Sequence, residues 1–281
     1  REVLGDELSL PRTPAERPAE APLPRAALHG LVPSQEPLLA VILAMQGLET
    51  KLLRGDLAEV GVAPREKISA RVGHPLRTAM ERLLRPFGAP PFEMVVSDVL
   101  TAPRVIQQDE PWVLLPSRLS SDRDPATLVT LARAAARIAL GYPWLFELPA
   151  ARIEALLVAV GRSVAPSFAR GRVDGISERF VAEYEAPIAK AMPRKVRKQL
   201  EETLAGVSAG EAAAPVDAAA FVDALVDGEL RLAWSLVGGL PAFTAGTSAA
   251  ARLADPRFHA LVRFAATREG AAWARRLGGL D

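Results

Sequence analysis

The stretch LVTLARAAARIALGYP (residues 128–143) and the segment before it, RVIQQDEPWVLLPSRLSSDRDPAT (104–127), decide the fold of this chain. The earlier segment contains two short runs of β-branched and apolar residues around the polar turn QDEP, which predicts two strands. Asp124 and Pro125 are typical of a helix start, and Gly141 is typical of a helix end. The order therefore predicts a small sheet followed directly by a long helix.

The rest of the sequence surrounds this unit with helices. A third strand is predicted at residues 91–98, and residues 64–73 are a candidate short helix. Apolar residues recur at helical spacing in seven further segments, which are 37–55, 74–88, 149–164, 175–192, 193–206, 217–239 and 256–278. We therefore expect an α+β fold that is mainly α with a small β-sheet.

The first 33 residues differ from the rest, because they are rich in Pro and lack periodicity. We expect residues 1–33 to be a linker or extended arm with little regular structure, and residues 34–281 to form a single domain. Its expected parts are N-terminal helices in 34–90, the sheet and its helix in 91–145, and C-terminal helices in 146–281. Because the chain begins with Arg rather than Met, we also expect it to be a piece of a longer protein.

Composition excludes several classes of function. The chain has no Cys, which excludes disulfides, thiolate catalysis and thiolate metal ligands. Its formal net charge of +1 gives no global attraction to nucleic acid, so we expect no nucleic-acid partner. The longest apolar segments are shorter than the roughly 20 residues of a membrane span. No signal-peptide pattern opens the chain, and we expect no transmembrane segment and a bacterial cytoplasmic location.

The order of strand, turn, strand and helix resembles the core of the HtpX-like zinc metallopeptidases. In that family the helix carries two His ligands four residues apart, with a Glu base after the first, and TLARAAARI (residues 130–138) fits this frame. Here Arg133 and Arg137 stand at the ligand positions and Ala134 at the base position. Two His at this spacing share one helix face and bind one Zn²⁺, whereas two Arg repel a cation. The resemblance therefore implies an inactive zincin-like core, wrapped by C-terminal helices, without catalytic residues, metal or cofactor.

The three His of the chain offer no replacement for these ligands. They are His29, His74 and His259, and none pairs with another at ligand spacing. A structural or solvated role is the favoured interpretation of each.

Residues 70–281 also resemble the C-terminal region of large tetratricopeptide-repeat proteins of myxobacteria, in phrases such as HPLRTAMERLLRPFG (74–88) and DPRFHALVRFAATREGAAWARRLGGL (255–280). Those chains carry helical repeats upstream of a degenerate peptidase-like module. The resemblance implies a non-enzymatic scaffold or interaction module with a protein partner. Two alternatives stay open: a regulatory module that binds an anionic small molecule at Arg133 and Arg137, and a hydrolase of unrecognised type.

Two further groups of charged residues are candidate functional residues. Glu178, Glu183 and Glu185 could act as an acid–base pair, but a solvated helix face is the favoured interpretation. A basic run could contact an anionic partner or lipid headgroups, although pairing with the acidic residues of the next turn again favours a solvated face. This run comprises Lys190, Arg194, Lys195, Arg197 and Lys198.

The two arginines of the long helix need acceptors if they are buried, because an unpaired charge in a low-dielectric interior costs several kcal/mol. We predict that at least one of Arg133 and Arg137 contacts a carboxylate across the former active site, so that a salt bridge replaces the metal as cross-link. The expected acceptors are Glu178 and Glu183, on the helix where the resemblance places the third, acidic ligand. The alternative is that both side chains run out to water along the helix.

Overall fold

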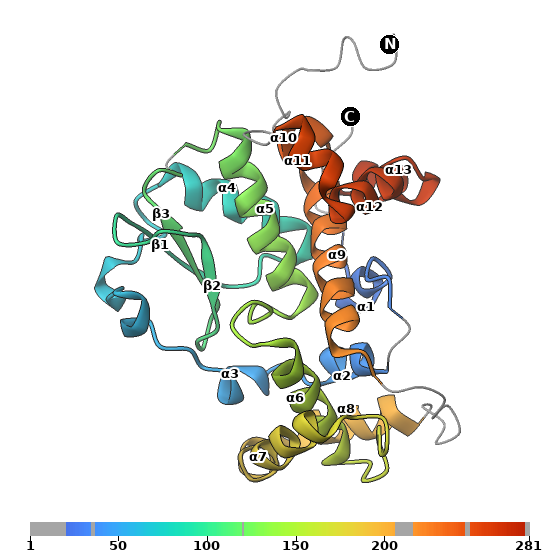
Figure 1. Cartoon of the computed structure of the whole chain (residues 1–281). Helices are drawn as coiled ribbons and strands as arrows, with labels where there is room; N and C mark the ends of the chain where they lie inside the picture. Colours follow the sequence, from blue (N-terminus) through green and yellow to red (C-terminus); the bar gives the residue numbers. More distant parts are fainter. Residues whose placement is uncertain (1–20, 35–36, 120, 206–215, 245–247, 279–281) are drawn as a thin grey trace.

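The computed structural model describes residues 21–34, 37–119, 121–205, 216–244 and 248–278, and these confirm a mainly α fold with one small sheet. Two long helices form its centre, α5 (Pro125–Leu140) and α9 (Ala218–Val237), which pack against each other (Figure 1). The sheet and α4 (Pro75–Leu84) lie beside α5, whereas the C-terminal helices lie beside α9 (Figure 1). The boundary between α5 and α9 is therefore central in the molecule.

The sheet has three short strands, β1 (Glu93–Ser97), β2 (Arg104–Ile106) and β3 (Trp112–Pro116). β3 lies in the middle, parallel to β1 and antiparallel to β2. Both faces of the sheet are apolar, as the unbroken hydrophobic runs of the strands indicate. One face joins the main core through residues such as Met94 and Val113. The other face packs with Leu57, Val62 and Leu100 in a small second core.

The long helix α5 begins and ends where its local sequence predicts. The Asp124 side chain accepts hydrogen bonds from the Thr127 amide and hydroxyl, both at 2.8 Å, and Pro125 occupies the first turn. Gly141 follows the helix with a φ of 87°, a left-handed conformation that glycine adopts without strain. The capping signals thus fix the positions of Arg133 and Arg137 within the helix.

The N-terminal part differs from the expected pattern in three places. The single helix expected over residues 37–55 is divided into α2 (Leu38–Ala44) and α3 (Glu49–Leu52), because Gly47 between them has a φ of +89°. Residues 64–73 contain only a 3-10 turn, η3 (Pro64–Glu66). A second 3-10 turn, η4 (Arg85–Phe87), continues α4, and a third, η2 (Ala58–Val60), precedes η3.

The expectation of an extended arm over residues 1–33 is wrong for residues 21–33. They contain a helix, α1 (Arg25–His29), and Leu28, Leu31 and Val32 are buried in the main core. A five-residue helix is too short to give a periodic signal, so tertiary contacts decide its conformation. The remaining part of the expected arm, residues 1–20, lies outside the described residues.

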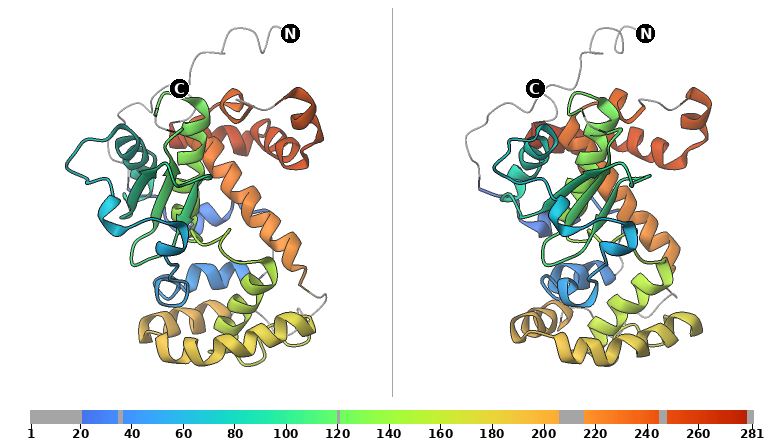
Figure 2. Two further views of the ribbon diagram at one scale, coloured as in Figure 1. Left: turned by 60° about the vertical axis from the view of Figure 1, so that its left-hand side comes forward. Right: turned by 90° about the vertical axis from the view of Figure 1, so that its left-hand side faces the viewer.

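The chain after α5 is helical, as expected, with one further division. Thr267 ends the helix predicted over 256–278 and caps a new one by accepting a hydrogen bond from the Gly270 amide at 2.9 Å. α9 runs from a layer formed by α6, α7 and α8 to the group formed by α10 to α13 (Figure 2). These helices are α6 (Ala150–Arg162), α7 (Gly175–Ala191), α8 (Arg194–Ala205), α10 (Leu240–Thr244), α11 (Ala249–Ala254), α12 (Pro256–Ala265) and α13 (Arg268–Leu277).

Within the described ranges, no helix combines the length and the apolar character needed to cross a membrane.

Candidate functional site

A buried carboxylate joins α9 to the two arginines of α5. Arg133 Nε donates a hydrogen bond to Glu229 Oε1 at 2.6 Å, and Arg137 Nε lies 3.7 Å from Glu229 Oε2. Arg133 and Arg137 are one turn apart on α5, so their side chains reach the same partner. The predicted contact between an arginine and a carboxylate is therefore present, and Glu229 is the acceptor.

The three side chains differ in their access to solvent. The Glu229 side chain has no exposed surface, whereas that of Arg137 is 10% exposed and that of Arg133 is 36% exposed. Burial lowers the pKa of the Arg137 guanidinium, while the nearby Glu229 carboxylate opposes that shift. A buried carboxylate of this kind depends on its cationic neighbours, because removing either partner leaves an uncompensated charge.

The loop after α5 completes the surroundings of Arg137. Residues 141–145 are buried, and the chain then brings Phe146 to the surface, with its ring centroid 5.0 Å from the Arg137 guanidinium carbon. Tyr142 is fully buried and donates a hydrogen bond to the Leu225 carbonyl of α9 at 3.0 Å. Glu147 forms an ion pair with Arg104 of β2. The loop thus ties α5, α9 and the sheet together at one place.

The acceptors expected from the sequence are wrong. Glu178 and Glu183 both lie on α7, which packs on α6 and is remote from the contact between α5 and α9. Glu178 pairs with Arg162 of α6 at 2.7 Å, and Glu183 pairs with Arg152 of the same helix. Glu185 is exposed, as a solvated helix face predicts. These carboxylates hold α7 on α6 and do not face Arg133 or Arg137.

One signal in the sequence marks Glu229 in retrospect. Phe221, Leu225 and Leu232 form a buried stripe along α9, and Glu229 occupies a position of that stripe four residues after Leu225. A charged residue at a core position of an amphipathic helix needs a partner of opposite charge. This interruption indicates a buried ion pair but does not reveal which helix supplies the arginine.

The residues at the peptidase-like positions do not fit a zinc ion. Arg133 and Arg137 are cations directed at Glu229, and Ala134, at the base position, is a buried methyl group. In the part of the chain that the structure describes, no group of three or more His, Asp or Glu side chains could hold a metal ion. His29 is buried on α1, His74 caps α4, and His259 is exposed on α12.

The basic run of the sequence lies elsewhere, at the end of α7 and along α8. Its side chains are exposed, and α8 packs on α2. Lys198 pairs with Glu202 at 3.6 Å, and Arg197 Nη1 donates to the Ser163 carbonyl at 3.4 Å. The basic run is thus separate from the site around Glu229. Its members are Lys190, Arg194, Lys195, Arg197 and Lys198.

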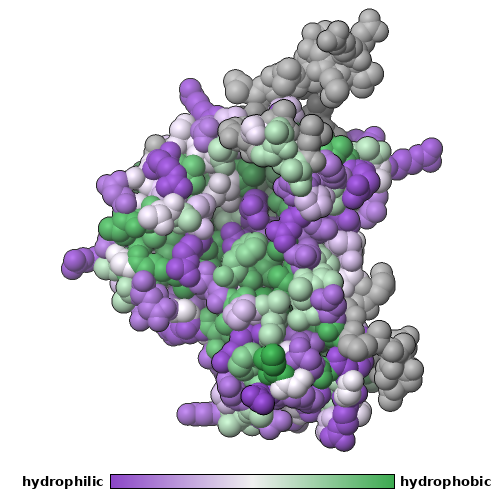
Figure 3. All heavy atoms as spheres, viewed as in Figure 1, coloured by the Kyte–Doolittle hydropathy of each residue, from purple (hydrophilic) through white to green (hydrophobic). Residues whose placement is uncertain are grey.

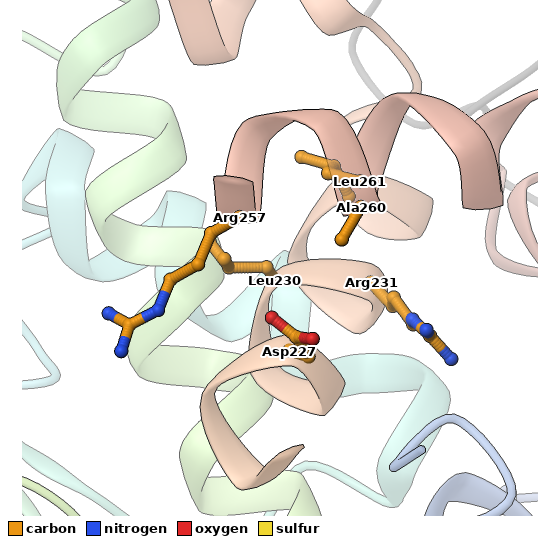
Figure 4. Close-up of a pocket in the computed structure, with 6 residues that line it drawn as sticks. All are labelled: Asp227, Leu230, Arg231, Arg257, Ala260 and Leu261. Atoms are coloured by element: carbon orange, nitrogen blue, oxygen red, sulfur yellow. The ribbon is translucent and has the colours of Figure 1, made fainter. Parts of the chain in front are cut away.

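A shallow depression lies between α9 and α12 (Figure 4). Asp227 lies in it, and burial raises the pKa of the Asp227 carboxyl. Its two arginines point away from one another, as Figure 4 shows. Arg231 donates to the Leu31 carbonyl and Arg257 pairs with Asp223, so neither is directed at a common ligand position.

No protein-family model matches this chain, and no curated protein or solved structure gives a significant match to it. The geometry around Glu229 is consequently the basis for the functional proposal.

Proposed function

We propose that this chain is a non-catalytic protein-interaction module on a peptidase-like frame, attached to helical repeats that precede it in a longer protein. The observation that carries the proposal is the ion pair of Glu229 with Arg133 and Arg137. A His₂Glu zinc site takes two ligands from positions four residues apart on one helix and its third ligand, a carboxylate, from a neighbouring helix. A salt bridge across those places keeps the two helices cross-linked and leaves no ligand for a metal.

The proposal has a chemical consequence for the wild-type protein. Arginine has no lone pair for a metal at neutral pH, and the methyl group of Ala134 cannot accept a proton from water. Purified protein should therefore contain no stoichiometric Zn²⁺ and should not cleave casein. Zinc bound at one ion per chain, lost on chelation together with casein cleavage, would overturn the proposal.

A restoration experiment tests the peptidase-like frame itself. The triple variant Arg133→His, Ala134→Glu, Arg137→His places two imidazoles on one helix face, opposite Glu229. We expect this variant to bind one Zn²⁺ per chain in elemental analysis, and Zn²⁺ should raise its melting temperature but not that of the wild type.

The matched control adds Glu229→Gln to the triple variant, and zinc binding should weaken at least tenfold because the carboxylate ligand is gone. A triple variant that is helical by circular dichroism yet binds no Zn²⁺ would show that the two positions and Glu229 do not form such a frame.

A further inference from the structure

The guanidinium group of Arg137 is incompletely used inside the protein. The 3.7 Å between Arg137 Nε and Glu229 Oε2 is beyond hydrogen-bonding reach, and this buried Nε has no hydrogen-bond partner among the described residues. Arg133 is bound to Glu229 through Nε alone, which leaves its Nη donors for solvent or a ligand. An arginine carries five N–H donors in a planar fork that matches a carboxylate. Because the Arg137 Nε is buried, the donors open to a ligand are the Nη groups of Arg133, whose side chain is 36% exposed where α5 reaches the surface.

The charges around the pair do not cancel. Three cations, Arg104, Arg133 and Arg137, lie near two carboxylates, Glu147 and Glu229, which leaves one positive charge in excess. Because Arg104 and Glu147 pair with each other, the excess belongs to the two arginines that share Glu229. One additional carboxylate would balance the site.

Phe146 adds an apolar element beside these donors. Its exposed fraction is 49%, although the five residues before it are buried, and its ring stacks over the Arg137 guanidinium. The face of the molecule that carries α5, the following loop and α9 shows an apolar area bordered by hydrophilic side chains (Figure 3). Aromatic and arginine side chains are also the residues that contribute most to protein–protein interfaces.

We propose that Arg133, Arg137 and Phe146 form a docking site for an acidic peptide segment of a partner protein, in which a carboxylate stands next to an apolar side chain. The carboxylate accepts hydrogen bonds from the exposed Nη groups of Arg133 and balances the excess charge of the two arginines, while the apolar side chain covers Phe146. The proposal deepens the interaction function proposed above and rests on it. A single excess charge is too small for a nucleic acid, whose binding needs several phosphate contacts.

Selection from a random heptapeptide library, with the immobilised full chain, tests the site. We expect the selected peptides to be enriched in Asp or Glu directly beside Leu, Ile, Val or Phe. In fluorescence anisotropy, Phe146→Ser and Arg133→Gln should each weaken binding of such a peptide at least tenfold. Replacement of its acidic residues by Asn or Gln should have the same effect, and binding should weaken as NaCl is raised.

Two matched controls are available on the same chain. Ile176→Ser removes an exposed apolar side chain from α7, and Arg179→Gln removes an exposed arginine from the same helix. Neither variant should change the affinity. Since Phe146 is half exposed, Phe146→Ser keeps the test valid if Arg133→Gln disturbs folding.

Three outcomes would overturn the docking site: no enrichment of acidic residues, equal binding to the Phe146→Ser variant, or a site saturated by acetate or inorganic phosphate alone, which would indicate a small free anion. If the peptide-binding test fails while the zinc and casein assays stay negative, only the docking site is refuted and the proposed non-catalytic function is retained. Casein cleavage by a protein that still binds the peptide would instead refute the non-catalytic function and leave the docking site supported.

Discussion

Glu229 is a carboxylate without exposed surface, and the guanidinium groups of Arg133 and Arg137 are the charges that compensate it. Breaking such a buried pair leaves a charge without a partner, which costs far more than breaking a pair in solvent. The energetic importance of this residue thus follows from its burial, since ion pairs elsewhere in the protein are as short but more exposed.

We expect Glu229→Gln to lower the free energy of unfolding by about 3 kcal/mol or more, because the buried Arg137 and the partly exposed Arg133 then lose their counter-charge. Glu183→Gln, which breaks the exposed pair with Arg152, should cost less than about 1 kcal/mol. A double-mutant cycle on Arg133→Met and Glu229→Gln should give a coupling above about 1 kcal/mol in urea unfolding. Coupling below about 0.5 kcal/mol would place Arg133 on a merely solvated surface.

His29 is the second residue whose burial has a measurable consequence. Its Nε2 donates to the Leu140 carbonyl at 2.8 Å at the end of α5, and within the described part of the chain its buried Nδ1 has no hydrogen-bond partner. Burial lowers the pKa of His29 from 6.5 to about 4, the bond to Leu140 opposes this, and Arg25 adds to it. The imidazole is therefore neutral in the folded protein at pH 7.

A lowered pKa in the folded state means that the unfolded chain binds the proton first as the pH falls. The contribution of the neutral His29 to the free energy of unfolding is fully present above pH 6.5. It is lost progressively toward pH 4, and the loss amounts to at most about 3 kcal/mol. His29→Gln keeps a donor for Leu140 but cannot titrate, so it should lose less stability between pH 7 and pH 4.5. Glu49, whose pKa is raised by burial, titrates in both proteins and cancels in the comparison. Identical pH dependence of urea unfolding in both proteins would contradict this role.

At the scale of elements, a glycine in the interior of α9 decides how closely other segments approach it. A β-carbon at Gly228 would lie 2.6 Å from Val32 Cγ2, 3.2 Å from Val32 Cα and 3.3 Å from the Tyr142 hydroxyl. Glycine in a helix interior is less favourable than alanine by about 1 kcal/mol. Here that cost permits the segment after α1 and the loop after α5 to pack on α9 next to Glu229.

Gly228→Ala should therefore destabilise the protein by roughly 1–3 kcal/mol, because overpacking outweighs the better helix propensity. Gly175→Ala is the matched control, since Gly175 is also helical, as the first residue of α7, and a β-carbon there would have no described neighbour within 4 Å. That control should be neutral or stabilising by up to about 1 kcal/mol. Thermal unfolding of both variants checks the opposite signs, and a stabilised Gly228→Ala variant would mean that α9 is less closely packed.

For the molecule as a whole, α1 is the segment that joins the N-terminal region to the central helices. Arg25 Nε donates to the Ala139 carbonyl at 3.2 Å, and with His29 it satisfies two carbonyls at the end of α5. Arg231 of α9 binds the Leu31 carbonyl at 3.2 Å. The segment is thus an integral part of the core and not an arm lying on it.

A chain that starts at residue 34 should be much less stable than one that starts at residue 21. The shorter chain loses the buried side chains of Leu28, Leu31 and Val32, each contributing about 1.5–3 kcal/mol. We expect a fall of many degrees in the melting temperature of the shorter chain, or a failure to fold. Equal melting temperatures of the two chains would restore the interpretation of residues 21–33 as a dispensable arm.

The sequence by itself determined the features whose physical cause lies within a few residues. Short β-branched and apolar runs bounded by turn residues located the three strands, and the caps Asp124 and Gly141 located α5 with the positions of Arg133 and Arg137. It also indicated that a buried arginine would need a carboxylate. These inferences succeed because capping and periodicity depend on neighbouring residues and not on the rest of the chain.

Only the tertiary structure decided which carboxylate that is, because Arg133 and Glu229 are separated by 96 positions. Several acidic residues on helical segments could supply that carboxylate, and Glu178 and Glu183 are among them. Long-range contacts also decide the conformation of α1. This helix is too short to be stable alone, and its segment is held by hydrogen bonds to α5 and α9. Long-range packing selects one partner among locally equivalent ones, so the cross-link at the centre of the molecule became visible only in the fold.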